Sequence, residues 1–119
     1  MENIDIKLEE EKVRRLLGGL SFFGKVVVND IERSTVIMSL NKGIVPVSID
    51  VNCDNGYSAV VVRVFGSGAF SSYGAEDGLY EVQVWRDGDV VYDTPITNDV
   101  LGYLNERDVI TAVSRIAEL

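Results

Sequence analysis

Near the start of the chain, hydrophobic residues recur at helical spacing. Over residues 8–17, one stripe is apolar and the positions between its members are charged. The stripe consists of Leu8, Val13, Leu16 and Leu17. Acidic side chains come first in this segment and basic ones last, an order that suits the helix dipole. We therefore predict a helix that ends at Gly18-Gly19, with a short strand over residues 4–8 allowed by the alternation before it.

The middle of the chain is typical of strands separated by turns. Alternating or β-branched residues predict strands over 25–29, 35–40, 44–53, 57–65, 79–85 and 90–92. In one of them Val47, Ile49 and Val51 share a face. Asn55-Gly56 predicts a two-residue hairpin turn, because both residues tolerate the positive φ that such a turn requires, and Asp87-Gly88 predicts another.

The end of the chain returns to helical spacing. Asn105 is expected to cap a last helix, and Val109, Val113 and Ile116 form its apolar stripe. Thr97 is expected to cap a short turn before it. The fold class that follows is α+β in a single domain: an antiparallel β-meander of five or six strands, with an N-terminal and a C-terminal helix packed on one face of the sheet.

Composition excludes several function classes. The chain has 119 residues, a net charge of −8, 11 basic against 19 acidic residues and no histidine. Binding of duplex nucleic acid is disfavoured, because it requires clustered Lys and Arg. Without histidine, and with Cys53 as its one cysteine, the chain offers no ordinary zinc site or Ser-His nucleophile, so we expect no metal, cofactor or catalytic activity.

The same composition bears on location. Cys53 lies on the apolar side of its predicted strand, so we expect a buried, inert thiol in a reducing compartment. Residues 1–8 carry several charges, and the longest apolar runs are far below membrane-spanning length. We therefore expect no signal peptide and a protein of the host cytoplasm. The acidity favours solubility or a basic protein partner.

A glycine-rich segment over residues 66–78 is expected to form a long, mobile connection. It carries Phe70 and Tyr73, which could stack on a planar ligand or insert into a partner. Glu76-Asp77, and Asp93 with Asp99, are the carboxylate pairs that general acid–base chemistry would use, although charged residues are ordinary in loops.

Three arginines and one tryptophan suggest a nucleotide pocket. Arg63, Arg86 and Arg107 could neutralise phosphate, while Trp85 stacks on a base. The alternative is that Trp85 covers the core and the arginines form surface ion pairs. Residues Thr97, Asn98 and Asp99 would read the polar edge of the base. In Phe22-Phe23, one ring should enter the core and the other is free for a dimer contact or a pocket wall.

Residues 78–82 and 92–104 resemble segments of small proteins encoded by phages and prophages. In size, acidity and element order the chain is similar to the Thoeris anti-defence proteins. That resemblance implies a signal sponge, which binds cyclic ADP-ribose-type nucleotides without cleaving them. It also implies a homo-oligomer with recessed pockets that use aromatic stacking and arginine–phosphate contacts.

Three functions therefore stay open. The first is such a sponge, in which Arg63 and Arg107 hold phosphates. The second is an anti-CRISPR or immunity-type inhibitor that binds a basic host defence protein through its acidic surface and aromatic loop. The third is an accessory or structural phage protein. The sponge requires that Arg63 and Trp85 face one hollow.

Overall fold

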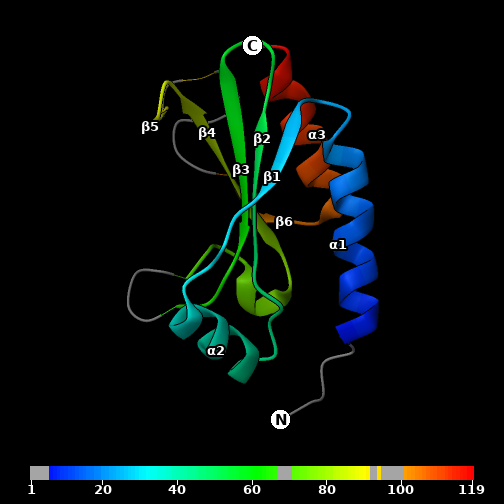
Figure 1. Cartoon of the computed structure of the whole chain (residues 1–119), viewed down its shortest axis with the longest axis vertical. Coiled ribbons are helices and arrows are strands. Elements are labelled where there is room, and N and C mark those ends of the chain that lie inside the picture. The colour runs from blue at the N-terminus through cyan, green and yellow to red at the C-terminus, as the bar shows by residue number, and fades with distance from the viewer. Residues whose placement is uncertain (1–5, 67–70, 92–93, 95–100) are drawn as a thin grey trace.

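A computed structural model describes residues 6–66, 71–91, 94 and 101–119 (Figure 1). The elements are α1 (Ile6–Leu20), β1 (Lys25–Val28), α2 (Arg33–Asn41), β2 (Val47–Asn52), β3 (Tyr57–Arg63), the 3₁₀ helix η2 (Ala75–Asp77), β4 (Tyr80–Arg86), β5 (Asp89–Val90), β6 (Leu101–Leu104) and α3 (Glu106–Ala117). The α+β meander is confirmed, since the six strands pair antiparallel in the order β1-β2-β3-β4-β5, with β6 also on β4. Helices α1 and α3 lie on one side of the sheet (Figure 1).

The core lies between the sheet and these two helices. Val51 pairs with Ala59 and Ala59 with Val84, so one row of small apolar side chains crosses three strands on the same face. All three are fully buried. Leu20 of α1 and Val113 of α3 pack on this face and are fully buried as well. Burial of apolar area, at about 25 cal/mol per Å², is the term that holds the layers together.

Residues 35–40 were expected to form a strand, and that prediction is wrong, because they belong to helix α2. The β-branched residues there favour a strand locally, but β1 pairs directly with β2, which leaves no place in the sheet between them. The buried Ser39 hydroxyl fixes the helix instead. It accepts a hydrogen bond from Phe65 N at 2.9 Å and donates one to Phe65 O at 3.1 Å.

Helix α1 also differs from the prediction at both ends. Residues 6–8 are helical rather than extended, and residues 1–5 lie outside the described part of the chain. At the other end the helix runs through Gly18-Gly19 to Leu20. Gly19 lets α1 approach α3, because a Cβ at this position would lie 2.8 Å from Cδ1 of Ile110.

The two hairpin turns differ. Asp87 and Gly88 both have positive φ, 54° and 84°, so the two-residue turn predicted there is confirmed. The turn at Asn55-Gly56 has three residues, 54–56, because Cys53 N donates to Tyr57 O at 3.0 Å and only Gly56 has positive φ. The Asn55 side chain donates to Ile116 O at 2.9 Å, which ties this turn to the end of α3.

Two smaller predictions are confirmed. The Asn105 side chain caps α3 by accepting a hydrogen bond from Asp108 N at 2.8 Å. In the aromatic pair after α1, Phe23 packs on the core and Phe22 is 85 % exposed. The turn expected after Thr97 lies outside the described residues.

Candidate functional site

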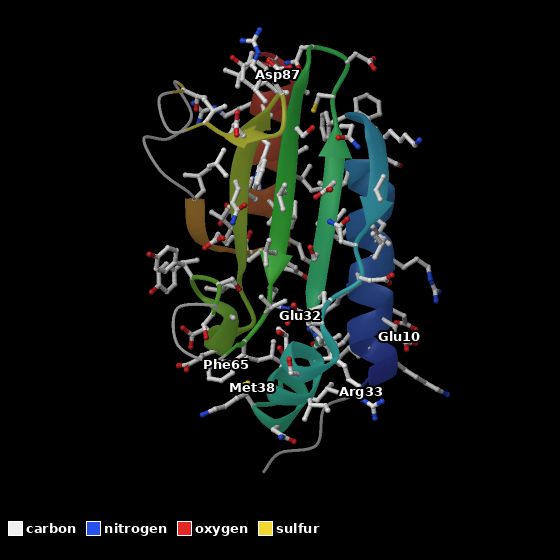
Figure 2. The ribbon with its side chains drawn as sticks, turned by 60° about the vertical axis from the view of Figure 1, so that its left-hand side comes forward. Glu10, Glu32, Arg33, Met38, Phe65 and Asp87 are labelled. Atoms are coloured by element: carbon white, nitrogen blue, oxygen red, sulfur yellow. The ribbon has the colours of Figure 1, made fainter. Side chains whose placement is uncertain are left out.

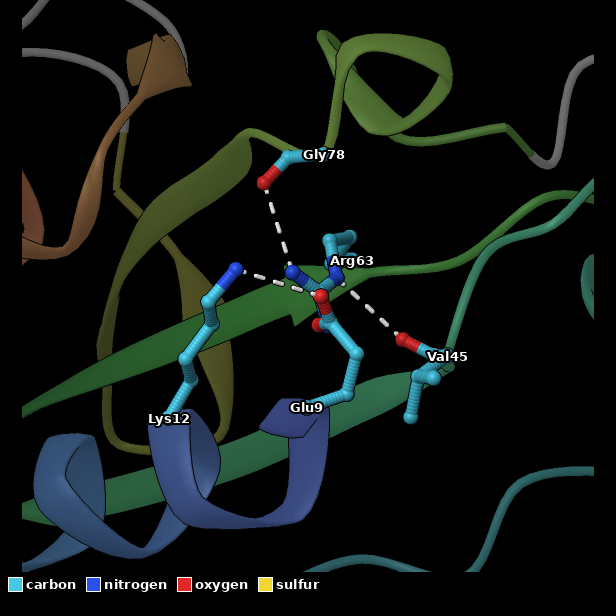
Figure 3. A network of polar contacts seen from close by, with 5 residues as sticks. All are labelled: Glu9, Lys12, Val45, Arg63 and Gly78. Atoms are coloured by element: carbon cyan, nitrogen blue, oxygen red, sulfur yellow. Dashed lines mark hydrogen bonds and ion pairs between the residues drawn. The ribbon is translucent and has the colours of Figure 1, made fainter. Parts of the chain in front are cut away.

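Arg63 ends β3 on the core face of the sheet, in the alternation that also buries Ala59 and Val61. Arg63 is 4 % exposed, and its guanidinium uses all three nitrogens (Figure 3). Nε donates to Val45 O at 3.2 Å, Nη1 to Gly78 O at 3.3 Å, and Nη2 to Glu9 Oε2 at 3.1 Å. Arg63 therefore joins α1 to the segments that lead into β2 and β4.

Tyr80 lies directly beside this cation. The Arg63 guanidinium carbon is 4.7 Å from the centre of the Tyr80 ring. The tyrosine is 1 % exposed, and its hydroxyl has no hydrogen-bond partner among the described residues. Burial raises the pKa of Tyr80, an effect that the Arg63 charge partly offsets. The phenol is therefore a neutral group with an unmet hydrogen bond.

A cavity of about 500 Å³ opens beside Arg63. It brings Arg63 and Arg107 together, as the nucleotide-pocket hypothesis requires. The charged side chains that line it are Lys12, Arg63 and Arg107 with Glu9, Glu76, Asp77 and Glu106. Three cations against four carboxylates leave no positive excess, so the cavity does not have the net potential that would attract a phosphate.

Trp85 does not belong to this cavity. In β4 the buried Val82 and Val84 point to the core, and the residues between them point to the other face of the sheet. Trp85 lies on that other face, opposite to Arg63, so the expected shared hollow is not formed. Arg86 is also occupied elsewhere, because Nη1 donates to the Tyr57 hydroxyl at 3.1 Å.

A line of hydrogen-bonded side chains runs from Trp85 along the open face of β4. Trp85 Nε1 donates to Gln83 Oε1 at 2.9 Å, and Gln83 Nε2 donates to Glu81 Oε2 at 2.9 Å. The other oxygen of the buried Glu81 accepts from the backbone N–H of Tyr73 at 3.4 Å. The line therefore ends under the segment that carries Tyr73.

Tyr73 and Tyr103 form a stacked pair on the surface. Their ring centres are 6.4 Å apart at an interplanar angle of 29°, and the residues are 54 % and 62 % exposed. Tyr103 has φ of +57°, which is uncommon for a residue with a bulky side chain. Tyr103 N donates to Tyr73 O at 3.2 Å. The backbone thus holds two large rings in solvent, at a cost in strain.

Two glycines make this pair possible. A Cβ at Gly102 would lie 2.5 Å from Cβ of Tyr73. Gly74 has φ of +90°, and a Cβ there would lie 2.9 Å from Cα of Tyr103. The two backbone segments therefore touch, and larger residues at these positions would separate them.

Within the glycine-rich segment over residues 66–78, the described residues 71–78 form a hydrogen-bonded unit rather than the expected mobile connection. Ser72 N donates to Val64 O at 2.9 Å, and the Ser72 hydroxyl accepts from Val64 N at 3.0 Å. A shallow hollow of about 300 Å³ lies beside Tyr73 and Tyr103. Exposed Glu76 and Asp77 line it, and no Lys or Arg does so within the described ranges.

The remaining candidates from the sequence are Phe70, Asp93, Thr97, Asn98 and Asp99, which lie outside the described residues. Sequence reasoning missed Tyr103 and Glu81. A signal for Tyr103 existed, because Tyr73-Gly74 and Gly102-Tyr103 each place a glycine beside a tyrosine.

Other kinds of site find no support in the described ranges. They contain no group of three or more His, Cys, Asp or Glu side chains that could hold a metal ion. No helix within them combines the length and apolar character needed to cross a bilayer. Cys53 is buried as expected, and burial, reinforced by the Asp54 charge, raises the pKa of its thiol.

A comparison with protein-family models, curated proteins and solved structures found no match to this chain.

Proposed function

We propose that this protein is a non-catalytic inhibitor that binds a basic partner protein through an acidic surface around Tyr73 and Tyr103. The observation that carries this proposal is the exposed tyrosine pair, which is held in place by a strained backbone. The link to phage counter-defence rests on the resemblance of residues 78–82 and 92–104 to small phage proteins.

Preorganised aromatic residues are what binding surfaces use as anchors. Tyrosine is enriched among the residues that dominate interface energetics, because it buries a large area with few rotatable bonds. Here Gly74 and Gly102 allow the two rings to lie together before any partner arrives. Because the two rings are already ordered in the free chain, binding of a partner would lose less conformational entropy.

The charge around the pair indicates the chemistry of the partner. Glu76 and Asp77 are exposed beside Tyr73, and the whole chain carries a net charge of −8. A Lys or Arg side chain can stack on a tyrosine face while it pairs with a carboxylate. The surrounding negative charge would also speed the approach of a basic protein.

Affinity capture from a bacterial host, followed by binding measurements with the purified partner, tests this function. We expect Tyr73→Ala and Tyr103→Ala each to weaken binding by at least about tenfold, as for interface anchors. Phe22→Ala is the matched control, because it removes an aromatic ring that is 85 % exposed elsewhere. If all three variants bind the partner as tightly as the parent chain, the tyrosine pair is not the contact.

A second candidate function is capture of a small anionic signal of the cyclic ADP-ribose type. Its support is that Arg63 and Arg107 line one cavity of about 500 Å³, a size that suits small ligands. The ligand would have to displace Glu9 from Arg63, and Trp85 would take no part. Thermal shift against cyclic nucleotides and ADP-ribose isomers tests it, with Arg107→Ala as the variant that should lose any stabilisation. No shift with any of these compounds removes this candidate.

A further inference from the structure

Strand β1 is an edge of the sheet with free hydrogen-bonding groups. It pairs with β2, and Asn29 N continues that ladder by donating to Ser48 O at 2.8 Å. In an antiparallel pair, residues bonded to the neighbour alternate with residues whose N–H and C=O point away. Val26 and Val28 therefore direct these groups outward. No described residue outside β1 hydrogen-bonds to them.

This edge lacks the features that usually prevent pairing with another chain. Natural edge strands are protected by charges, proline or bulges, or are covered by another element. In β1 only Lys25 is charged, and Val27 and Val28 are 39 % and 63 % exposed. The β1 edge is therefore prepared to accept a further strand.

We propose that two copies of this chain join their sheets through β1. The strands run antiparallel about a two-fold axis that passes between Val27 and Val27 of the second copy. In this register Val26 donates to and accepts from Val28 of the second copy, and Val28 does the same with Val26 of that copy. When a strand pairs with its own copy about a two-fold axis, the N–H and C=O groups of Val26 in each copy meet those of Val28 in the other, so each hydrogen bond is formed twice.

Helix α1 lies on the core side of the sheet, and its side away from α3 carries charged, exposed residues. Helix α3 contacts β3 and β4, and α1 contacts α3, so α1 lies toward the β1 edge. Gly19 faces α3, and Glu10 precedes it by two and a half turns, so Glu10 lies on the side of α1 away from α3 (Figure 2). Exposed Arg14 follows one turn after Glu10.

A two-fold axis normal to the sheet reverses the direction of the second α1. The two helices would then lie antiparallel on the same face. On the open face, Lys25 would lie opposite Asn29 of the second copy, which holds Asp50 by a hydrogen bond of 2.9 Å. The approach of Lys25 to the Asn29–Asp50 pair of the second copy opposes the repulsion between two acidic chains, and it favours a second copy as the occupant.

Disulfide trapping tests the register. Val27→Cys places two thiols across a non-hydrogen-bonded pair, where Cα atoms are about 4.5 Å apart and a disulfide can form. Lys25→Cys is the matched control, since the two copies of residue 25 would be about 13 Å apart along the strands. The native Cys53 is buried and should not interfere. We expect rapid covalent dimers from Val27→Cys and few from Lys25→Cys; equal yields would overturn the proposal.

Sedimentation over a range of concentrations tests the hydrogen bonds. Val28→Pro removes an outward N–H on each copy without touching the bonds to β2, and we expect the dissociation constant to rise by at least about tenfold. Val28→Thr keeps the N–H and should leave dimerisation unchanged. A parent chain that stays monomeric at every concentration, or that pairs β1 with some other protein instead, would overturn the proposal. The outcome is independent of the tyrosine surface, which lies on other elements.

Discussion

Glu9 Oε2 accepts a hydrogen bond of 3.1 Å from Arg63 Nη2, and this ion pair ties the first helix to the last residue of β3. The arginine is almost fully buried, whereas the glutamate side chain is 21 % exposed. Arg63 thus links α1 to the sheet, and its charge is balanced by one carboxylate.

Removal of that carboxylate should destabilise the fold. Glu9→Ala leaves the buried Arg63 guanidinium without its counter-charge, so we expect the free energy of unfolding to fall by about 1–3 kcal/mol in urea titrations. Glu11→Ala removes an exposed carboxylate from the same helix and should change it by less than about 0.5 kcal/mol. Equal effects of the two variants would mean that the ion pair contributes nothing.

Gly102→Ala should separate the tyrosine pair. The added Cβ would lie 2.5 Å from Cβ of Tyr73, so one backbone segment has to move. We expect a loss of about 1–3 kcal/mol in stability and the disappearance of ring–ring contacts between Tyr73 and Tyr103 in NMR spectra. Gly18→Ala is the control, because its Cβ meets nothing within 4 Å, and a helical alanine should stabilise the chain by up to about 1 kcal/mol. Intact ring contacts in Gly102→Ala would contradict the tight approach.

Ser39→Ala should loosen helix α2. It leaves both the N–H and the C=O of Phe65 without the serine hydroxyl, so unfolding should become easier by about 1–3 kcal/mol. Amide hydrogen exchange should quicken in α2 more than in α3. Ser34→Ala, at an exposed position of the same helix, provides the comparison. An unchanged exchange rate in α2 would show that Ser39 does not hold it.

Stability should decline in alkaline solution. Burial raises the pKa of Cys53 above its ordinary value of 9.0 and that of Tyr80 above 10.0. Both groups therefore keep their protons longer in the folded chain than in the unfolded chain. Their contribution is complete below pH 9 and is lost as the pH rises through the folded-state pKa values.

Single substitutions separate the two groups. In Cys53→Ala the decline should begin near pH 10 rather than 9, and Tyr80→Phe should remove the later part of it. At neutral pH, Tyr80→Phe removes a buried hydroxyl without a partner, so the chain should be as stable as before or slightly more so. A clear loss of stability at neutral pH would reveal a bond to that hydroxyl.

Much of the fold was predictable, because alternation reports burial wherever a strand has one face on the core. Val47, Ile49 and Val51 gave β2 in this way, and the cap at Asn105 gave the start of α3. The strand prediction for residues 35–40 failed because their β-branched side chains favour a strand, while the pairing of β1 with β2 leaves no place in the sheet for one.

The site was harder to predict for two different reasons. The alternation along the strands does indicate that Arg63 and Trp85 lie on opposite faces of the sheet. Arg63 continues the series of Ala59 and Val61 on the core face, whereas Trp85 is the neighbour of Val84 and points to the other face. The tyrosine pair had no such pattern. The pair joins two segments that are thirty residues apart in the sequence through contact between their backbones, and local sequence propensities do not predict such a long-range contact.

The hydrogen-bonded line from Trp85 to Tyr73 has a practical consequence. Trp85 is the only tryptophan of the chain, and its indole N–H is linked through Gln83 and Glu81 to the backbone beneath the tyrosine surface. Its emission spectrum is therefore an intrinsic optical sensor for that surface. Occupation of the surface should shift the fluorescence without any added dye.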